Sequence, residues 1–113
     1  DPFGELRRLL DIQLGINYST RLRRSLGAND VDTALLCAER LIRYRPLSGN
    51  AFMDYGFLLY LNGEADSAVY YFRRANGLLE NFKEMWKQMV STSAYKSVDE
   101  DIEFKNEVFR IQY

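Results

Sequence analysis

Apolar residues between positions 51 and 79 recur at three- and four-residue steps, the spacing of one face of an α-helix. They form two groups on either side of Asn62 and Gly63, a pair typical of tight turns. Asp66 lies where the second group begins, as an N-terminal capping residue does. The pattern therefore predicts a helical hairpin of two short antiparallel helices.

Small residues inside this hairpin indicate how its two helices pack. Gly56 and Ala68 lack bulky side chains, so the two helix backbones are expected to approach closely there. Phe52 and Phe72 are expected to fill the space beside them. A hairpin of this kind has further apolar residues to cover, which favours stacking on similar units.

The N-terminal part of the chain shows the same helical spacing. Residues 1–15 predict a helix that Gly15 ends. Residues 14–26 predict either a second helix after that break or a continuation of the first, and Gly15 favours the break. A turn at residues 27–30 then leads into a helix over residues 31–44.

The C-terminal part predicts two more helices. One extends from Phe82 to about Ala94, and a turn over residues 97–99 follows it. The last helix is expected from Glu100 to Gln112, with acidic residues in its first turn, where the helix dipole favours them. No segment favours a strand over these helical patterns, so the chain is predicted to be all-α, with six to seven helices.

The chain repeats itself at an interval of 34 residues. Aromatic residues coincide in the first helix of each unit, and carboxylates coincide in the first turn of each second helix. The coinciding residues are Tyr18, Phe52 and Trp86, and Asp32, Asp66 and Glu100. Agreement of several independent positions at one offset indicates three copies of a hairpin unit.

Residues 49–82 resemble the 34-residue tetratricopeptide repeat (TPR) at its aromatic, small and turn positions. The matching residues are Phe52, Tyr55, Gly56, Leu59, Gly63, Ala68, Phe72 and Ala75. Residues 15–48 match in their second half, through Ala34 and Pro46, and depart from the pattern in their first half. Residues 83–113 keep Trp86 and lose the alanines, as a terminal capping unit does.

This resemblance implies one TPR-like domain over residues 1–113, a short right-handed stack of antiparallel helical hairpins, or α-solenoid. An N-terminal helix over 1–14 precedes repeat units at 15–48, 49–82 and 83–113, and the last unit acts as a cap. Stacking is physically required, because a single hairpin cannot bury both of its faces.

The resemblance also implies a function, the gripping of a peptide or partner helix in a concave groove lined by the first helices. When the first helices are drawn as helical wheels, the candidate residues on the groove-facing side are Arg23, Met53, Asp54, Phe57, Tyr60 and Lys87. Met53, Phe57 and Tyr60 favour an apolar or amphipathic ligand. The competing interpretation is that Phe57 and Tyr60 pack against an adjoining helix. The set of Lys, Asn and Arg residues with which some TPR proteins grip a terminal carboxylate is not reproduced.

An alternative function is self-association, or assembly into a larger complex, through terminal apolar helices. The last helix carries apolar residues on more than one side, namely Val108, Phe109, Ile111 and Tyr113. These residues are expected to be covered by the N-terminal helix, a second copy or a following repeat. The expected partners are therefore a protein or peptide, with a homo-oligomer as the alternative.

Composition argues against catalysis and against cofactor or metal binding. The chain has no histidine and one cysteine, so His dyads and Cys/His zinc sites are absent within it. No nucleophile–base pair or phosphate-binding glycine loop is present. The acidic run over residues 99–103 lacks the spacing of a calcium loop and is interpreted as a charged helix start. The sequence thus predicts an adaptor that is not an enzyme.

Charge and hydropathy address the remaining partner classes. The net charge is −1, so no overall electrostatic footprint for nucleic acid is present. The densest basic cluster, Arg7, Arg8, Arg21, Arg23 and Arg24, is interpreted as a solvated helix face or a surface for an acidic protein. No run approaches the ~20 apolar residues of a membrane span, so neither nucleic-acid binding nor membrane insertion is predicted.

Overall fold

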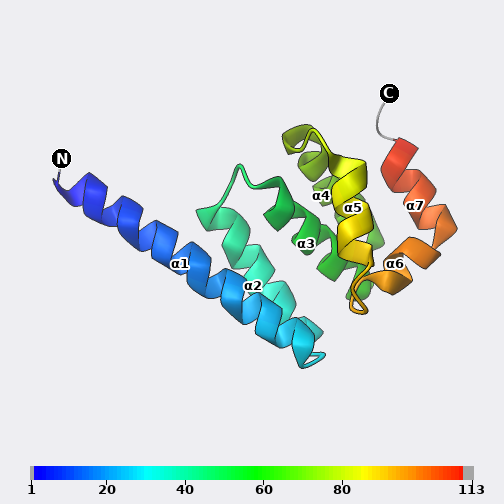
Figure 1. The fold of residues 1–113 in the computed structure, drawn as a ribbon, viewed down its shortest axis with the longest axis horizontal. Coiled ribbons are helices and arrows are strands. Elements are labelled where there is room, and N and C mark those ends of the chain that lie inside the picture. Colours follow the sequence, from blue (N-terminus) through cyan, green and yellow to red (C-terminus); the bar gives the residue numbers. More distant parts are fainter. Residues whose placement is uncertain (1, 111–113) are drawn as a thin grey trace.

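The computed structural model describes residues 2–110, which fold into seven α-helices with no strand among them (Figure 1). The helices are α1 (Pro2–Gly27), α2 (Val31–Tyr44), α3 (Gly49–Leu61), α4 (Ala65–Leu78), α5 (Phe82–Val90), α6 (Lys96–Glu100) and α7 (Ile102–Phe109). The predicted all-α class is confirmed.

Helix α1 is one continuous helix of 26 residues. The predicted break at Gly15 is therefore wrong, and the alternative of a continuous helix is correct. Gly15 is buried, and a Cβ there would lie 3.0 Å from Nε of Arg45 in the α2–α3 connection. This glycine permits a close approach between chain segments, at a cost in helix propensity of up to about 1 kcal/mol relative to alanine.

The first hairpin pairs the C-terminal half of α1 with α2, as Figure 1 shows. The predicted turn at 27–30 is present, with Asn29 at a φ of 57°. Asp30 caps α2, because its side chain accepts a hydrogen bond from the Thr33 backbone N–H at 3.1 Å. Helix α2 has the predicted bounds, and it packs on its other side against α3.

The second hairpin, α3 and α4, has the predicted turn and packing. Gly63 takes a φ of +83°, a conformation that favours glycine at a turn. A Cβ at Gly56 would lie 3.0 Å from three ring atoms of Phe72, so the two helices meet closely at this point. Ala68 and Phe72 are fully buried, as the sequence predicts for packing positions.

The C-terminal helices differ most from the prediction. Helix α5 ends at Val90 rather than near Ala94, because the hydroxyls of Ser91 and Thr92 donate to backbone carbonyls one turn back and compete with helix continuation. The predicted turn over 97–99 is instead part of the one-turn helix α6, which the buried side chain of Val98 anchors.

Helix α7 begins at Ile102, two residues later than predicted, because Asp101 serves as its N-cap and accepts a hydrogen bond from the Phe104 backbone N–H at 3.1 Å. The predicted end at Gln112 lies outside the described residues.

An aromatic cluster joins the C-terminal helices to the second hairpin. Phe57 lies at its centre, with ring centroids 4.9 Å from Phe72, 4.8 Å from Trp86 and 4.5 Å from Tyr95. All four side chains are buried. Because these residues come from α3, α4, α5 and the segment before α6, one cluster holds four parts of the chain together.

Candidate groove between α1 and α5

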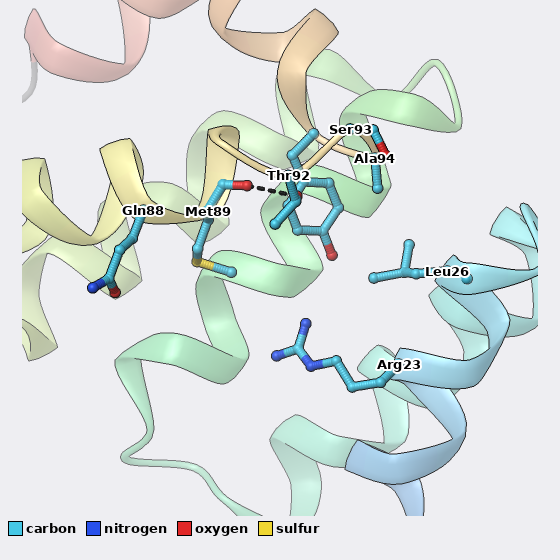
Figure 2. Close-up of a pocket in the computed structure, with 9 residues that line it drawn as sticks. Arg23, Leu26, Gln88, Met89, Thr92, Ser93 and Ala94 are labelled. Atoms are coloured by element: carbon cyan, nitrogen blue, oxygen red, sulfur yellow. Dashed lines mark hydrogen bonds between the residues drawn. The ribbon is translucent and has the colours of Figure 1, made fainter.

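An open groove of about 400 Å³ lies between the C-terminal end of α1, helix α5 and the segment that follows α5. Figure 2 shows Arg23 and Leu26 on the α1 side, and Gln88 and Met89 on the α5 side. Gly27 and the four residues Thr92, Ser93, Ala94 and Tyr95 complete the lining. The groove thus combines apolar side chains with hydroxyl, amide and guanidinium groups.

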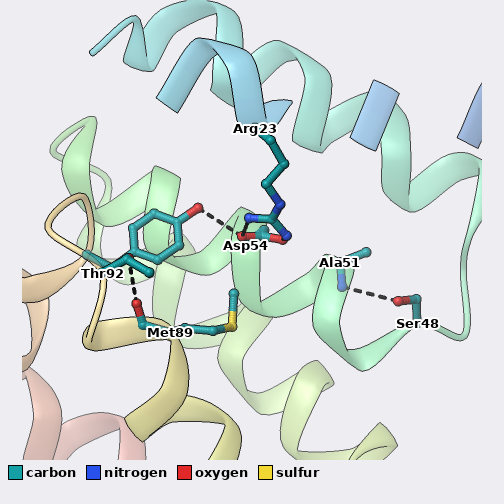
Figure 3. Close-up of polar contacts among 7 residues, drawn as sticks. Arg23, Ser48, Ala51, Asp54, Met89 and Thr92 are labelled. Carbon is teal, nitrogen blue, oxygen red and sulfur yellow. Dashed lines mark hydrogen bonds and ion pairs between the residues drawn. The ribbon is translucent and has the colours of Figure 1, made fainter. Parts of the chain in front are cut away.

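A polar triad lies at the edge of this groove, formed by the buried Asp54 and Tyr95 and by Arg23, whose side chain is 56% exposed. Two guanidinium nitrogens of Arg23 donate to the Asp54 carboxylate, Nη2 to Oδ2 at 2.8 Å and Nη1 to Oδ1 at 3.2 Å (Figure 3). The Tyr95 hydroxyl donates to Asp54 Oδ1 at 2.9 Å. The triad therefore connects α1, α3 and the segment before α6 through one carboxylate, in a bidentate geometry that suits arginine.

The electrostatics of the triad follow from its burial. The Asp54 side chain is 2% exposed, and this burial raises the pKa of its carboxyl, an effect that Arg23 and Tyr95 partly offset. Burial also raises the pKa of the Tyr95 hydroxyl, and the neighbouring Asp54 charge raises it further. Burial lowers the pKa of Arg23, but the charge and the hydrogen bonds of Asp54, together with Tyr95, outweigh that effect and leave the pKa raised. Tyr95 and Arg23 therefore stay protonated near neutral pH.

The structure brings two of the predicted groove residues together, since Arg23 lines the groove and pairs with Asp54, but Asp54 is itself buried and does not line it, so its predicted accessible position is wrong. Met53 and Phe57 are 0% exposed, so their predicted accessible position is wrong. The physical reason is that Tyr95 stacks on Phe57, with ring planes 10° apart, and covers the face of α3 that the helix projection left open.

The other two predicted groove residues also lie apart from the groove. Tyr60 is half-buried, its hydroxyl donates to Asp101, and its ring lies 4.5 Å from that of Phe104. For Phe57 and Tyr60 the competing interpretation, packing against an adjoining helix, is thus the correct one. Lys87 is exposed on the other side of α5, where it lines a shallow cleft of about 220 Å³ with Trp86.

Sequence reasoning missed Leu26, Met89 and the segment from Thr92 to Tyr95 as groove lining. The sequence pattern includes the polar run before Tyr95 in a predicted helix from Phe82 to about Ala94, whereas in the structure this run follows the end of α5 at Val90. One signal was available: a tyrosine isolated in a polar stretch often packs its ring and pairs its hydroxyl.

Asp99 and Asp101, two of the acidic residues of 99–103, have structural partners. Asp99 accepts a hydrogen bond from Trp86 Nε1 at 2.8 Å and pairs with Lys105 at 2.8 Å. Asp101 caps α7 and accepts from the Tyr60 hydroxyl. Within residues 2–110, no three His, Cys, Asp or Glu side chains gather in a way that can hold a metal ion.

Comparison of the chain with protein-family models, curated proteins and solved structures gives no match. Among the helices of residues 2–110, none combines the length and apolar character needed to cross a membrane.

Proposed function

We propose that this chain is a protein-interaction module of the tetratricopeptide type, which holds an apolar or amphipathic segment of a partner in the groove between α1 and α5. The observation that carries the proposal is the groove itself, an open hollow of about 400 Å³ with apolar walls and polar groups side by side. A site with this mixture suits one face of a peptide or helix.

The helical arrangement supports a TPR-type stack. The pairs α1/α2 and α3/α4 are helical hairpins, and α2 packs against α3, so consecutive hairpins are neighbours. The close approach of Gly56 to Phe72 occurs at two of the positions that carry the sequence resemblance. In this proposal, the aromatic cluster around Phe57 attaches the degenerate third unit as a cap.

The groove chemistry indicates how a partner segment would be held. Leu26 and Met89 offer apolar surface, and methionine adapts its shape to different side chains. Arg23 uses two of its nitrogens on Asp54 and keeps further N–H donors, since a guanidinium carries five. Gln88 and Thr92 add an amide and a hydroxyl at the rim.

The proposed role is binding rather than catalysis. A general base works best with a pKa near the operating pH. Tyr95 has a pKa raised above its ordinary value, and Asp54 is engaged by two neighbours. The triad therefore serves in this proposal to fix the shape of the groove.

A displayed peptide library tests the proposal. Peptides selected on the 113-residue chain should lose at least tenfold in affinity for Met89→Lys, which places a charge in the groove. The matched control is Leu47→Lys, since Leu47 is 81% exposed in the α2–α3 connection, and it should bind the same peptides unchanged. Equal affinity for both variants would contradict groove binding. Phe57→Ala is unsuitable for this purpose, because Phe57 belongs to the core.

Self-association is the alternative function, and one observation favours it at the N-terminus rather than at the C-terminus. In α7, Val108 is buried, and Phe109 packs its ring against Phe82 and Trp86. Ile111 and Tyr113 lie outside the described residues. Helix α1, by contrast, exposes several aliphatic side chains.

A further inference from the structure

A second hollow, of about 380 Å³, lies on another side of α1 from the groove. Residues of α1 alone line it, and the name arginine hollow is used for this set: Leu14, Asn17, Tyr18, Thr20, Arg21 and Arg24. Arg23 of the groove is two residues beyond Arg21, which places it roughly 160° away around the helix, at about 100° per residue. No residue lines both sites.

Two neutral side chains of the arginine hollow keep unused hydrogen-bond donors. The Tyr18 hydroxyl accepts a hydrogen bond from Arg40 Nη1 at 3.3 Å, so its own O–H is left to donate. Asn17 Oδ1 accepts from Gln13 Nε2 at 3.0 Å, which leaves the two N–H groups of the Asn17 amide. Both side chains can therefore donate to a bound ligand.

The two arginines of the hollow add only donors. Neither the Arg21 nor the Arg24 guanidinium forms a hydrogen bond or an ion pair with a residue in the range 2–110. Thr20 is the exception among the polar lining residues, since its hydroxyl donates to the Ile16 carbonyl at 3.0 Å and keeps acceptor capacity. No carboxylate lines the hollow, so its chemistry is matched to an anion.

Tyr18 holds positive charge in place before any ligand binds. The guanidinium carbons of Arg21 and Arg40 lie 5.8 Å and 5.9 Å from the centroid of the Tyr18 ring. This ring is itself fixed by stacking on Tyr44, with centroids 5.9 Å apart. Two cations at one ring repel each other, and a bound anion offsets that repulsion.

The surrounding charges leave this positive field largely uncompensated. Residues 12–29 contain three arginines and no acidic residue. On α2, Glu39 pairs with Arg43 at 3.7 Å, and the Asp30 side chain is engaged in capping the helix. Asp32 forms no ion pair with any residue that the structure describes. The hollow is thus locally basic in a chain whose net charge is −1.

We propose that the arginine hollow binds a phosphorylated side chain, phosphoserine or phosphothreonine, of a protein partner. A phosphate group carries a charge of about −1.5 to −2 near neutral pH and three acceptor oxygens, so it can accept from several of these donors at once. A carboxylate carries a single charge and two oxygens, and would leave more of the donors unpaired. Leu14 adds an apolar edge for a neighbouring residue of the partner. This site goes beyond the groove proposal and does not depend on it.

The structure favours a protein over a nucleic acid as the source of the phosphate. Tyr18 is the only aromatic residue of the hollow, and its ring is half-buried against Tyr44 and two guanidinium groups, so little of it is left for a base to stack on. Residues 47–113 carry seven Lys and Arg against ten acidic residues. The basic surface therefore does not extend across the molecule, as a run of backbone phosphates requires.

An NMR titration of the isotope-labelled 113-residue chain tests the proposal. The probe is a pool of short peptides with phosphoserine fixed at the centre and random residues on both sides, and the reference is the same pool with serine. The phosphoserine pool should shift the side-chain amide signals of Asn17 and bind at least tenfold more tightly than the serine pool. A pool with glutamate at the centre should also bind more weakly than the phosphoserine pool.

Variants of four exposed arginines locate the binding. Arg21→Gln/Arg24→Gln removes both guanidinium groups from the hollow and should weaken binding of the phosphoserine pool at least tenfold. The matched control Arg7→Gln/Arg8→Gln removes the same charge from the same helix, outside the hollow, and should bind within twofold of the wild type. Because all four positions are exposed, circular dichroism should show an unchanged fold. Met89→Lys, the variant that tests the groove, should also leave this binding unchanged.

The remaining outcomes overturn the proposal, each in a distinct way. An equal loss of binding in the two arginine double variants shows diffuse attraction and excludes a built site. Equal affinity for the glutamate and phosphoserine pools excludes phosphate as the preferred anion. A wild-type chain that does not bind the phosphoserine pool excludes a phosphorylated protein as the partner, including the case in which Arg21 and Arg24 instead hold the chain on phosphatidylserine vesicles or single-stranded DNA.

Discussion

The Tyr95 hydroxyl donates a hydrogen bond to the Asp54 carboxylate at 2.9 Å, across 41 residues of sequence. Arg23 reaches the same carboxylate from α1. The first hairpin, the second hairpin and the C-terminal helices thus share one buried anion, and the position of Tyr95 also sets one wall of the groove.

Tyr95→Phe tests how much this hydrogen bond contributes to the stability of the fold. The variant keeps the ring that stacks on Phe57 and removes one donor to a buried carboxylate, so it should lower the free energy of unfolding by about 1.5–3 kcal/mol. Urea denaturation measures the change. The control Tyr70→Phe, at a ring that is 51% exposed, should change stability by less than about 0.5 kcal/mol. Equal effects of the two variants would contradict the role given to Tyr95.

Gly56→Ala should destabilise the second hairpin. Its Cβ would lie 3.0 Å from the ring of the fully buried Phe72, so the ring must shift, at a cost of about 1–3 kcal/mol. The matched control is Gly77→Ala in α4, where a Cβ meets no atom within 4 Å. That variant should be neutral or stabilising by up to about 1 kcal/mol, because alanine favours the helix. Thermal unfolding of both variants makes the comparison, and a stabilising Gly56→Ala would be inconsistent with the close approach.

Phe57→Ala should cost about 3–5 kcal/mol of stability, because it removes the central ring of the aromatic cluster. The groove variant Met89→Lys, at a half-buried side chain, should cost far less. Denaturant unfolding separates the two. A mild effect of Phe57→Ala would mean that this side chain is as accessible as its sequence position suggests.

Stability should fall in acid through Asp99 and Asp101. Hydrogen bonds from Lys105 and Trp86 lower the pKa of Asp99, and those from Tyr60 and the Phe104 backbone lower the pKa of Asp101. A carboxyl whose pKa is lowered by folding stabilises the protein above its unfolded-state pKa, near 4, and loses this contribution as the pH falls through the folded-state value.

Melting temperatures of the wild type and of Asp99→Asn/Asp101→Asn between pH 7 and pH 3 check this expectation. The double variant should have a lower melting temperature than the wild type at pH 7, and its melting temperature should fall less between pH 7 and pH 3. Asp54 acts with the opposite sign, because burial raises its pKa and its protonation then favours the folded state as the pH falls. If the melting temperatures of the wild type and the variant fall in parallel, Asp99 and Asp101 do not account for the loss of stability in acid.

The sequence was sufficient for features governed by local spacing. Helical periodicity predicts the bounds of α2, and turn chemistry predicts the turn at Gly63. The small size of Gly56 predicts the close approach of α3 and α4 at that position. Gly15 was misinterpreted because its role depends on Arg45, a contact between segments 30 residues apart. Helix propensity alone cannot distinguish a glycine that ends a helix from one that accommodates a neighbour.

The candidate site was less predictable than the fold. Of the predicted groove residues, Arg23 lines the groove, whereas Asp54 is buried beneath it, because a helix projection treats every neighbouring segment as absent. Tyr95 covers Phe57 only because α5 ends early and the chain turns back, and that depends on hydroxyl–carbonyl bonds in a polar stretch. Which side chains stay accessible is therefore a property of the tertiary structure.

The indole of Trp86 has a consequence for watching this molecule in solution. It is the only tryptophan of the chain, it is 1% exposed, and it connects α5 to Asp99 while touching Phe57 and Phe72. Its fluorescence spectrum therefore reports whether the C-terminal helices are packed against the rest of the molecule. Far-ultraviolet circular dichroism mainly reports α1 to α4, because these are the longest helices. A red shift in emission that precedes the loss of ellipticity would show that the C-terminal helices detach before the helices α1 to α4 unfold.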